Sequence, residues 1–259
     1  MTNHIHGSVL SVTGLKLSFG GNTVLHGISL DFGAGKIIGL IGPNGAGKTS
    51  FFNCLTGLYH PQEGSICFEG QDLTHTQPYQ RAVQGFSRSF QHVVLCNELT
   101  IIENVVVGLN LYAKSGWLSA FLPLSDARKE RSNNLDLAME TLERLGISSE
   151  ANKFPNELPP GLLRLAEIAR AIVGSPKVML LDEPAAGLNS VETRDLSQTI
   201  LSLRSKELII IVVEHDMDLV MNVCDEIHVL NVGSILASGT PSEIQNNTEV
   251  IEVYLGGEL

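Results

Sequence analysis

The N-terminal quarter of the chain alternates apolar and polar positions with a period of two. The apolar positions of three such segments are Leu15, Leu17 and Phe19, then Ile28, Leu30 and Phe32, and then Ile66 with Phe68. Successive side chains of a strand point to opposite faces of a sheet, so this alternation is typical of strands with one buried face. We therefore predict antiparallel strands in this part of the chain.

The period changes between about Ser125 and Leu145. The apolar positions there are Leu135, Met139, Leu142 and Leu145. Their spacing of three or four residues places them on one face of a helix, with Ser125 as a suitable cap and Gly146 as a stop signal. We predict a helical subdomain that extends from about residue 93 to residue 174.

Continuous apolar runs occupy the remaining core positions. They are Ile37 to Ile41, Val178 to Leu181 and Leu208 to Val213, and a helix is expected from Val191 to Leu203 between the last two. Such runs suit central parallel strands that are buried on both faces. A hairpin is expected from Ile227 to Ala237. The chain is thus predicted to be one α/β domain, residues 1–259, with an N-terminal antiparallel β subdomain and an inserted α-helical subdomain.

A glycine-rich octet follows the first apolar run, and a helix-like segment, Phe51 to Leu58, follows the octet. The octet extends from Gly42 to Thr49 and has the sequence Gly-Pro-Asn-Gly-Ala-Gly-Lys-Thr. A bound triphosphate needs inward backbone N–H groups, little side-chain bulk, one cation and one hydroxyl for the metal, and this octet supplies all four. Similar loops that bind nothing also occur by chance. The predicted nucleotide-binding residues are Gly42, Asn44, Gly45, Ala46, Gly47, Lys48, Thr49 and Ser50, in a P-loop NTPase core.

Two acids follow the apolar run Val178 to Leu181. Ligand sites in open α/β sheets form at the carboxyl ends of strands, where Asp182 and Glu183 are expected to lie. Asp182 would orient the Mg²⁺ shell, and Glu183 would polarise an attacking water. The alternative is a strand that ends in two solvated acids.

Charge and composition exclude several classes of protein. The net charge of −11, from 17 Lys and Arg against 28 Asp and Glu, argues against binding to nucleic acid and to anionic lipid. No apolar stretch approaches the roughly 18 residues that span a bilayer. Residues 1–7 lack the layout of a signal peptide, and the four cysteines form no CxxC pair. These features favour a reducing cytoplasm.

The order of these motifs resembles that of the ATP-binding subunits of ABC transporters. The order is the phosphate loop, Ser89 to Gln91, Leu158 to Arg170, Asp182 with Glu183, and Glu214 with His215. The resemblance implies ATP and Mg²⁺ as ligands, bound between two subunits that close head to tail. It also implies that Gln91 contacts Mg²⁺, that His215 contacts the γ-phosphate, and that Phe19 stacks on adenine. In isolation, Gln91 would be a surface loop residue, His215 a structural one and Phe19 part of an apolar face.

A closer resemblance is to the ATP-binding subunits of branched-chain amino acid importers. It is carried by Arg88 to Gln91, Glu98 to Asn104, Glu183 to Asn189, Glu214 to Met221 and Tyr254 to Gly257. It implies two integral membrane permease subunits, a second ATPase subunit, a periplasmic or extracellular solute-binding protein, and a peripheral position on the cytoplasmic face of the inner membrane. Related systems import amides or urea.

One segment departs from the family pattern. Where the family signature is close to Leu-Ser-Gly-Gly-Gln, this chain has Leu158, two prolines, Gly161 and Leu162. Importers of this type also have proline in the second place, so Pro160 and Leu162 are the larger departures. Proline donates no backbone N–H and leucine has no amide, which puts three contacts to phosphate or ribose in doubt, although Gly161 remains. We hypothesise a heterodimer with a partner whose signature is intact; a homodimer is the alternative. A regulatory subunit or a soluble ABC ATPase with little hydrolysis is the alternative function.

Overall fold

The computed structural model describes residues 8–89, 94–109 and 124–255. A four-stranded antiparallel sheet has the order β2-β1-β4-β5, as the period-two pattern predicted. Its strands are β1 (Ser8–Phe19), β2 (Asn22–Gly33), β4 (Glu63–Phe68) and β5 (Gln71–Asp72).

A second sheet has six strands in the order β10-β9-β3-β8-β7-β6, and all of them are parallel except β10. The strands are β3 (Ile37–Ile41), β6 (Phe86–Arg88), β7 (Val178–Asp182), β8 (Ile209–Val213), β9 (Glu226–Asn231) and β10 (Ser234–Gly239). Each predicted apolar run forms one central strand, and the predicted hairpin is β9 with β10.

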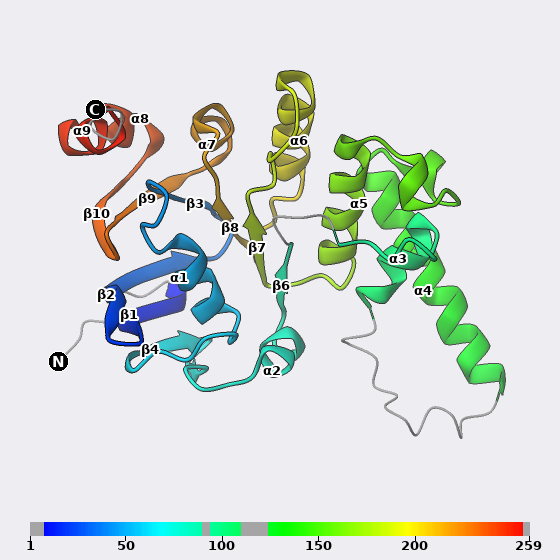
Figure 1. Cartoon of the computed structure of the whole chain (residues 1–259). Helices are drawn as coiled ribbons and strands as arrows, with labels where there is room; N and C mark the ends of the chain where they lie inside the picture. Colours follow the sequence, from blue (N-terminus) through cyan, green and yellow to red (C-terminus); the bar gives the residue numbers. More distant parts are fainter. Residues whose placement is uncertain (1–7, 90–93, 110–123, 256–259) are drawn as a thin grey trace.

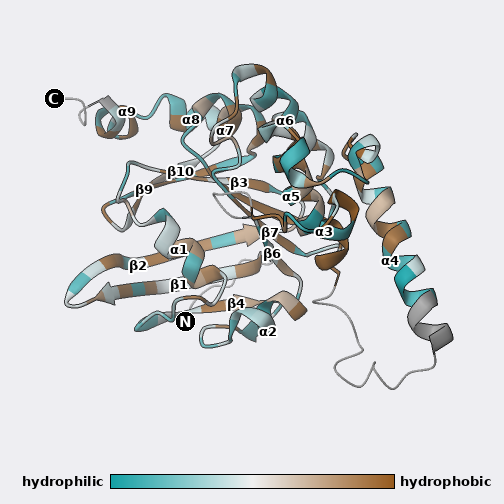
Figure 2. Cartoon of the chain, turned by 45° about the vertical axis from the view of Figure 1, so that its right-hand side comes forward, coloured by the Kyte–Doolittle hydropathy of each residue, from teal (hydrophilic) through white to brown (hydrophobic). Residues whose placement is uncertain are grey.

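The apolar core is divided into two clusters, one on each face of the six-stranded sheet. In β7, Met179 and Leu181 belong to the cluster under the helices, whereas Val178 and Leu180 belong to the cluster that faces the smaller sheet. Strands β3 and β8 alternate in the same way, and every residue of all three strands is buried. Burial on both faces explains why these runs lack polar positions. The hydrophobic residues of these central strands are brown in Figure 2.

The helices form three groups around the sheets (Figure 1). Helix α1 (Lys48–Leu55) lies between the two sheets, and the short α2 (Pro78–Val83) precedes β6. The C-terminal helices are α6 (Ser190–Ser202), α7 (Met217–Val223), α8 (Pro241–Gln245) and α9 (Thr248–Leu255). Helices α3 (Ile101–Val107), α4 (Leu124–Arg144) and α5 (Pro160–Ile172) pack together on one side. Two 3₁₀ turns, Ser148–Glu150 and Pro155–Glu157, connect α4 to α5.

Two predictions about helix ends differ from the structure. Helix α4 begins at Leu124, so Ser125 is its second residue and not its cap. Helix α1 ends at Leu55 rather than Leu58, because Gly57 has a positive φ of 79° and the chain turns there. Phe19 continues the alternation of β1 but is 46% exposed, so it is not part of the apolar core. Gln91 lies outside the described residues, as do residues 110–123, and the subdomain boundaries at 93 and 174 remain a prediction.

Candidate nucleotide-binding site

The phosphate loop connects β3 to α1 and requires glycine at defined positions. Gly42, Gly45 and Gly47 have positive φ values of 150°, 80° and 104°. A Cβ atom at Gly42 would lie 2.0 Å from the carbonyl oxygen of Leu230, and one at Gly47 would lie 2.9 Å from Leu25 Cδ2. The loop therefore fits against neighbouring strands only without side chains at these two positions.

The N-terminus of α1 provides donors and positive charge. No side chain caps this end, so its first-turn N–H groups have no intrahelical partner and point toward the loop. The Nζ atom of Lys48 donates to the carbonyl oxygens of Gly42 at 2.6 Å and Pro43 at 3.0 Å. Burial lowers the pKa of Lys48, and the negative charges of Glu183 and Asp182 oppose this shift. A bound phosphate would meet the same donors.

Neighbouring strands bring Glu183 and His215 together. Strand β7 pairs with β8 in parallel, with Asp182 opposite Val213, which confirms that the two strands are neighbours. His215 Nε2 lies 2.9 Å from Glu183 Oε1, and the backbone N–H of Glu183 donates to the carbonyl oxygen of Val213 at 2.8 Å. Glu183 has a φ of 45°, a conformation that is uncommon for a residue other than glycine and is often found at functional sites.

The phosphate loop and this pair line one cavity of about 250 Å³. Its lining residues are Val24, Asn44, Gly45, Ala46, Gly47, Lys48, Thr49, Ser50, Glu183 and His215. Gly42 forms the base of the loop. Among the described residues, Phe19 does not line the cavity; its ring contacts Tyr59 edge to face at 5.1 Å.

The donor groups near the cavity fit Mg²⁺. Within residues 8–89, 94–109 and 124–255, no three His, Cys, Asp or Glu side chains gather as a metal cluster. Thr49 and Asp182 supply a hydroxyl and a carboxylate, and both are hard oxygen ligands. Mg²⁺ commonly uses one or two such ligands together with waters and substrate phosphates. These residues therefore suit an ion that binds with a nucleotide.

Glu214 has a structural role that its sequence context did not predict. Its buried carboxylate accepts backbone N–H bonds from Ala185 at 2.6 Å, His215 at 2.8 Å and Asp216 at 3.1 Å. Burial raises the pKa of Glu214, and these three bonds act in the opposite direction. The carboxylate thus joins the segment after Glu183 to the segment that carries His215. An acid directly after a continuous apolar run was the available signal.

C-terminal elements support the phosphate loop. Gly233, in the β9–β10 turn, donates its N–H to the carbonyl oxygen of Ala46 at 2.9 Å and accepts from the N–H of His26 at 2.8 Å. On α9, the phenol of Tyr254 contacts the backbone of Gly42, and burial raises the pKa of Tyr254 to about 12. The β9–β10 turn and α9 therefore both contact the phosphate loop, which is also continuous with β3.

The altered signature segment begins α5. Pro159 is the N-cap and Pro160 the first helical residue, and both are exposed. Gly161 packs beside α6, where an added Cβ would lie 3.0 Å from Glu192 Oε1. Leu162 packs against the apolar core. The two prolines leave the N–H groups of Gly161 and Leu162 as the first donors of this helix.

The phosphate loop leads into α1 and lies beside two parallel strands. Asp182 ends one strand, and Glu183 and His215 follow the two strand ends. This arrangement defines a P-loop ATPase cassette. Residues 25–186 match the family described as ABC transporter. The chain belongs to the ABC transporter family, and it binds and hydrolyses ATP as the ATPase subunit of a transport system. Residues 234–259 also match the family described as branched-chain amino acid ATP-binding cassette transporter.

Two curated relatives and one solved structure are similar over nearly their whole lengths. The high-affinity branched-chain amino acid transport ATP-binding protein LivG of Escherichia coli is 45% identical, over 96% of this chain and 98% of its own. The protein of the same description, BraF of Pseudomonas aeruginosa, is 39% identical with the same coverage. A crystal structure of an ATP-binding cassette of an ABC transporter in its ADP conformation has a TM-score of 0.82 and 29% identity, and covers 96% of this chain and 99% of its own. In the part of the chain that the structure describes, no helix has the length and apolar character of a membrane span.

Proposed function

We propose that this chain hydrolyses ATP to drive an importer of branched-chain amino acids or related small polar solutes. The observation that carries the proposal is the contact between Glu183 and His215 at the cavity of the phosphate loop. Similarity to LivG and BraF over nearly the whole chain supports the cargo class.

In this proposal, the loop amides and Lys48 bind the phosphates of ATP, and Phe19 stacks on the adenine. Glu183 accepts a proton from the attacking water, and His215 orients Glu183 and contacts the γ-phosphate. Thr49, Asp182 and Gln91 would hold Mg²⁺, which would neutralise phosphate charge when bound. These steps need positioned groups and charge, and the cavity supplies both.

We place the subunit at the cytoplasmic face of the inner membrane, held there by two permease subunits. A solute-binding protein outside the membrane delivers the cargo. A second ATPase subunit with an intact signature completes the site of this chain, while the partner's phosphate loop meets the altered segment at Pro159 to Leu162. No nucleic acid is involved, consistent with the net charge of −11.

Restoring Ser at position 159 and Gln at position 162 is expected to raise ATP turnover of the assembled transporter by several-fold to about tenfold, because lost contacts to phosphate are regained. Steady-state phosphate release measures this effect. The single variant Pro159→Ala restores the N–H alone and serves as the matched control. An unchanged turnover in the double variant would show that the altered signature does not limit the rate.

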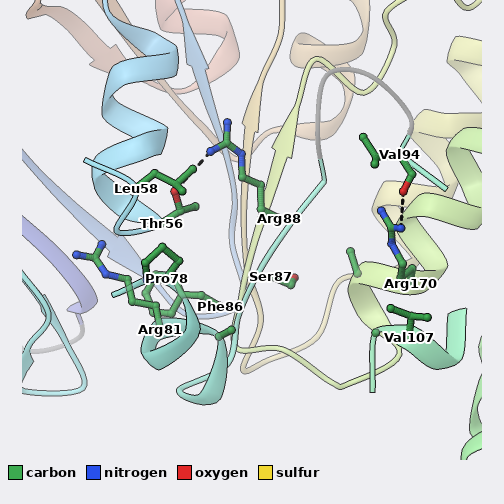
Figure 3. A pocket seen from close by; sticks show the side chains of 13 residues that line it. Thr56, Leu58, Pro78, Arg81, Phe86, Ser87, Arg88, Val94, Val107 and Arg170 are labelled. Carbon is green, nitrogen blue, oxygen red and sulfur yellow. Dashed lines mark hydrogen bonds between the residues drawn. The ribbon is translucent and has the colours of Figure 1, made fainter. Parts of the chain in front are cut away.

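An apolar groove supports docking to a permease. A cavity of about 590 Å³ separates α1 and α2 from α3 and α5, and Figure 3 shows Leu58 and Pro78 on one wall and Val94 and Val107 on the other. Leu58 is 53% exposed, Val94 56% and Val107 43%. Exposed apolar side chains that gather around one groove often mark a site of protein–protein interaction. We propose that a short permease helix places its apolar face in this groove.

Replacing Val107 by Asp is expected to lower association with the permeases at least about tenfold, because the charge would be buried in an apolar interface. Co-purification from gently solubilised membranes measures association, and ATP binding by the free subunit should be unchanged. The matched control is Leu137→Asp, at a 45% exposed leucine of α4 that does not line the groove. Equal recovery of permeases with both variants would argue against docking in the groove.

The proposed function is tested by mass spectrometry of what co-purifies with the chain and by uptake measurements. Two polytopic permeases and a second ATPase, together with ATP-dependent uptake of leucine in proteoliposomes, would support it. Uptake of urea or an amide in place of leucine would change the cargo that we assign. Co-purification of a soluble partner alone would refute the proposal that the chain belongs to an importer.

A further inference from the structure

Arg88 connects the phosphate-loop helix to the acid at the end of β7. It is the last residue of β6, and its side chain is 11% exposed. Its Nη2 atom lies 2.6 Å from Asp182 Oδ2, and its Nη1 atom donates to Asn53 Oδ1 at 2.7 Å. The guanidinium also lies 5.8 Å from the centre of the Phe52 ring. One side chain therefore contacts the two elements that supply the metal ligands, α1 and β7.

The planar guanidinium fixes both partners. Arginine donates through a rigid fork, so two bonds to different elements restrict their relative position more than a lysine ammonium would. Thr49 is the second residue of α1, the helix that carries Asn53, and Asp182 is the last residue of β7. The distance between the hydroxyl and the carboxylate that suit Mg²⁺ is thus set partly by Arg88.

The same contact reduces the negative charge of Asp182. The Asp182 side chain is 8% exposed, so solvent screens this pair weakly. A cation at 2.6 Å opposes the attraction of the carboxylate for a second cation. Arg88 should therefore weaken divalent-metal binding while it keeps Asp182 in position for hydrolysis.

Arg88 is also part of the groove wall (Figure 3). Thr56, near the end of α1, lines the same cavity. A residue in the wall of the groove thus contacts the carboxylate of the metal site directly.

We propose that Arg88 is a positioning residue for ATP hydrolysis, which orients Asp182 and limits its affinity for the divalent metal. This inference rests on the proposed function, because it assumes that Asp182 and Thr49 hold the metal of a bound nucleotide.

The test is a titration of the nucleotide-bound subunit with Mn²⁺, followed by electron paramagnetic resonance, together with single-turnover hydrolysis. For Arg88→Met we expect the half-saturating Mn²⁺ concentration to fall at least about fivefold, because one neighbouring positive charge is removed. The hydrolysis rate should fall at least about tenfold, because Asp182 loses its position. Tighter metal binding with slower hydrolysis is a combination that a purely structural role does not produce.

Two variants separate charge from position. Arg88→Lys and Asn53→Ala keep the positive charge but lose the fork or one of its anchors, so each should bind Mn²⁺ within about twofold of the wild type and hydrolyse ATP more slowly. Arg204→Met removes another Arg–Asp pair, Arg204 with Asp225 at 2.9 Å on the surface, and should change neither quantity.

Wild-type or weaker Mn²⁺ affinity in Arg88→Met would overturn the inference. If Arg88→Met does not fold, unchanged hydrolysis in both Arg88→Lys and Asn53→Ala would overturn it. If the wild-type subunit shows no Mn²⁺ binding with nucleotide and no hydrolysis in the assembled transporter, the proposed function fails instead.

Discussion

Replacing Glu183 by Gln is expected to lower ATP hydrolysis at least about a thousandfold while ATP binding remains nearly intact. The amide has the same shape as the carboxylate, and its oxygen can still accept the bond from His215, which now lies 2.9 Å from Glu183 Oε1. It cannot take a proton from the attacking water. The φ of 45° at this position is retained, because the two side chains place the same demand on the backbone.

Two measurements check this expectation: single-turnover phosphate release, and equilibrium binding of a fluorescent ATP analogue. Glu207→Gln is the matched control, since this acid is exposed and lies before β8. Hydrolysis at the wild-type rate in Glu183→Gln would refute the role assigned to Glu183. A parallel loss of ATP binding would indicate that the carboxylate maintains the loop rather than the reaction.

Replacing Lys48 by Met is expected to weaken ATP binding at least about a hundredfold, equivalent to roughly 3 kcal/mol. Lys48 is 6% exposed, and its positive charge interacts with the carboxylates of Glu183 and Asp182. Without it, the two carboxylates repel the triphosphate. The methionine retains most of the buried length, so the loss reflects charge and hydrogen bonding more than packing.

Isothermal titration calorimetry measures the affinity of Lys48→Met, and circular dichroism shows whether the variant is folded. Lys206→Met removes one exposed lysine at a distance from the cavity and should bind ATP as the wild type does. Wild-type affinity in Lys48→Met, with the fold intact, would mean that the loop amides alone hold the phosphates.

Much of the fold follows from local sequence patterns. The runs that form β3, β7 and β8 were recognisable because burial on both faces removes polar residues. The phosphate loop was recognisable because its glycines are required at adjacent positions of the chain. The proximity of His215 to Glu183 needed only one further assumption, that β7 and β8 are neighbours, and the pairing confirms it.

Contacts between distant residues did not follow from the sequence. Arg88 and Asp182 are 94 positions apart, and their ion pair depends on the register between β6 and β7. The three N–H groups that bind Glu214 converge only after two loops have folded beside each other. Local periodicity contains no information on such convergence. The end of α1 was missed for a simpler reason, because the apolar Leu58 extended the helical pattern beyond a glycine turn.

The turn at Gly233 and the Tyr254 side chain both contact the backbone of the phosphate loop, on residues Ala46 and Gly42. A displacement of the β9–β10 turn or of α9 would therefore reach the phosphate loop directly, because Gly233 contacts Ala46 and Tyr254 contacts Gly42. This short path makes the C-terminal end the place where an attached domain or bound protein would stiffen or distort the loop without entering the cavity. Truncation of the chain before β10 would for the same reason change nucleotide binding, although none of the removed residues lines the cavity.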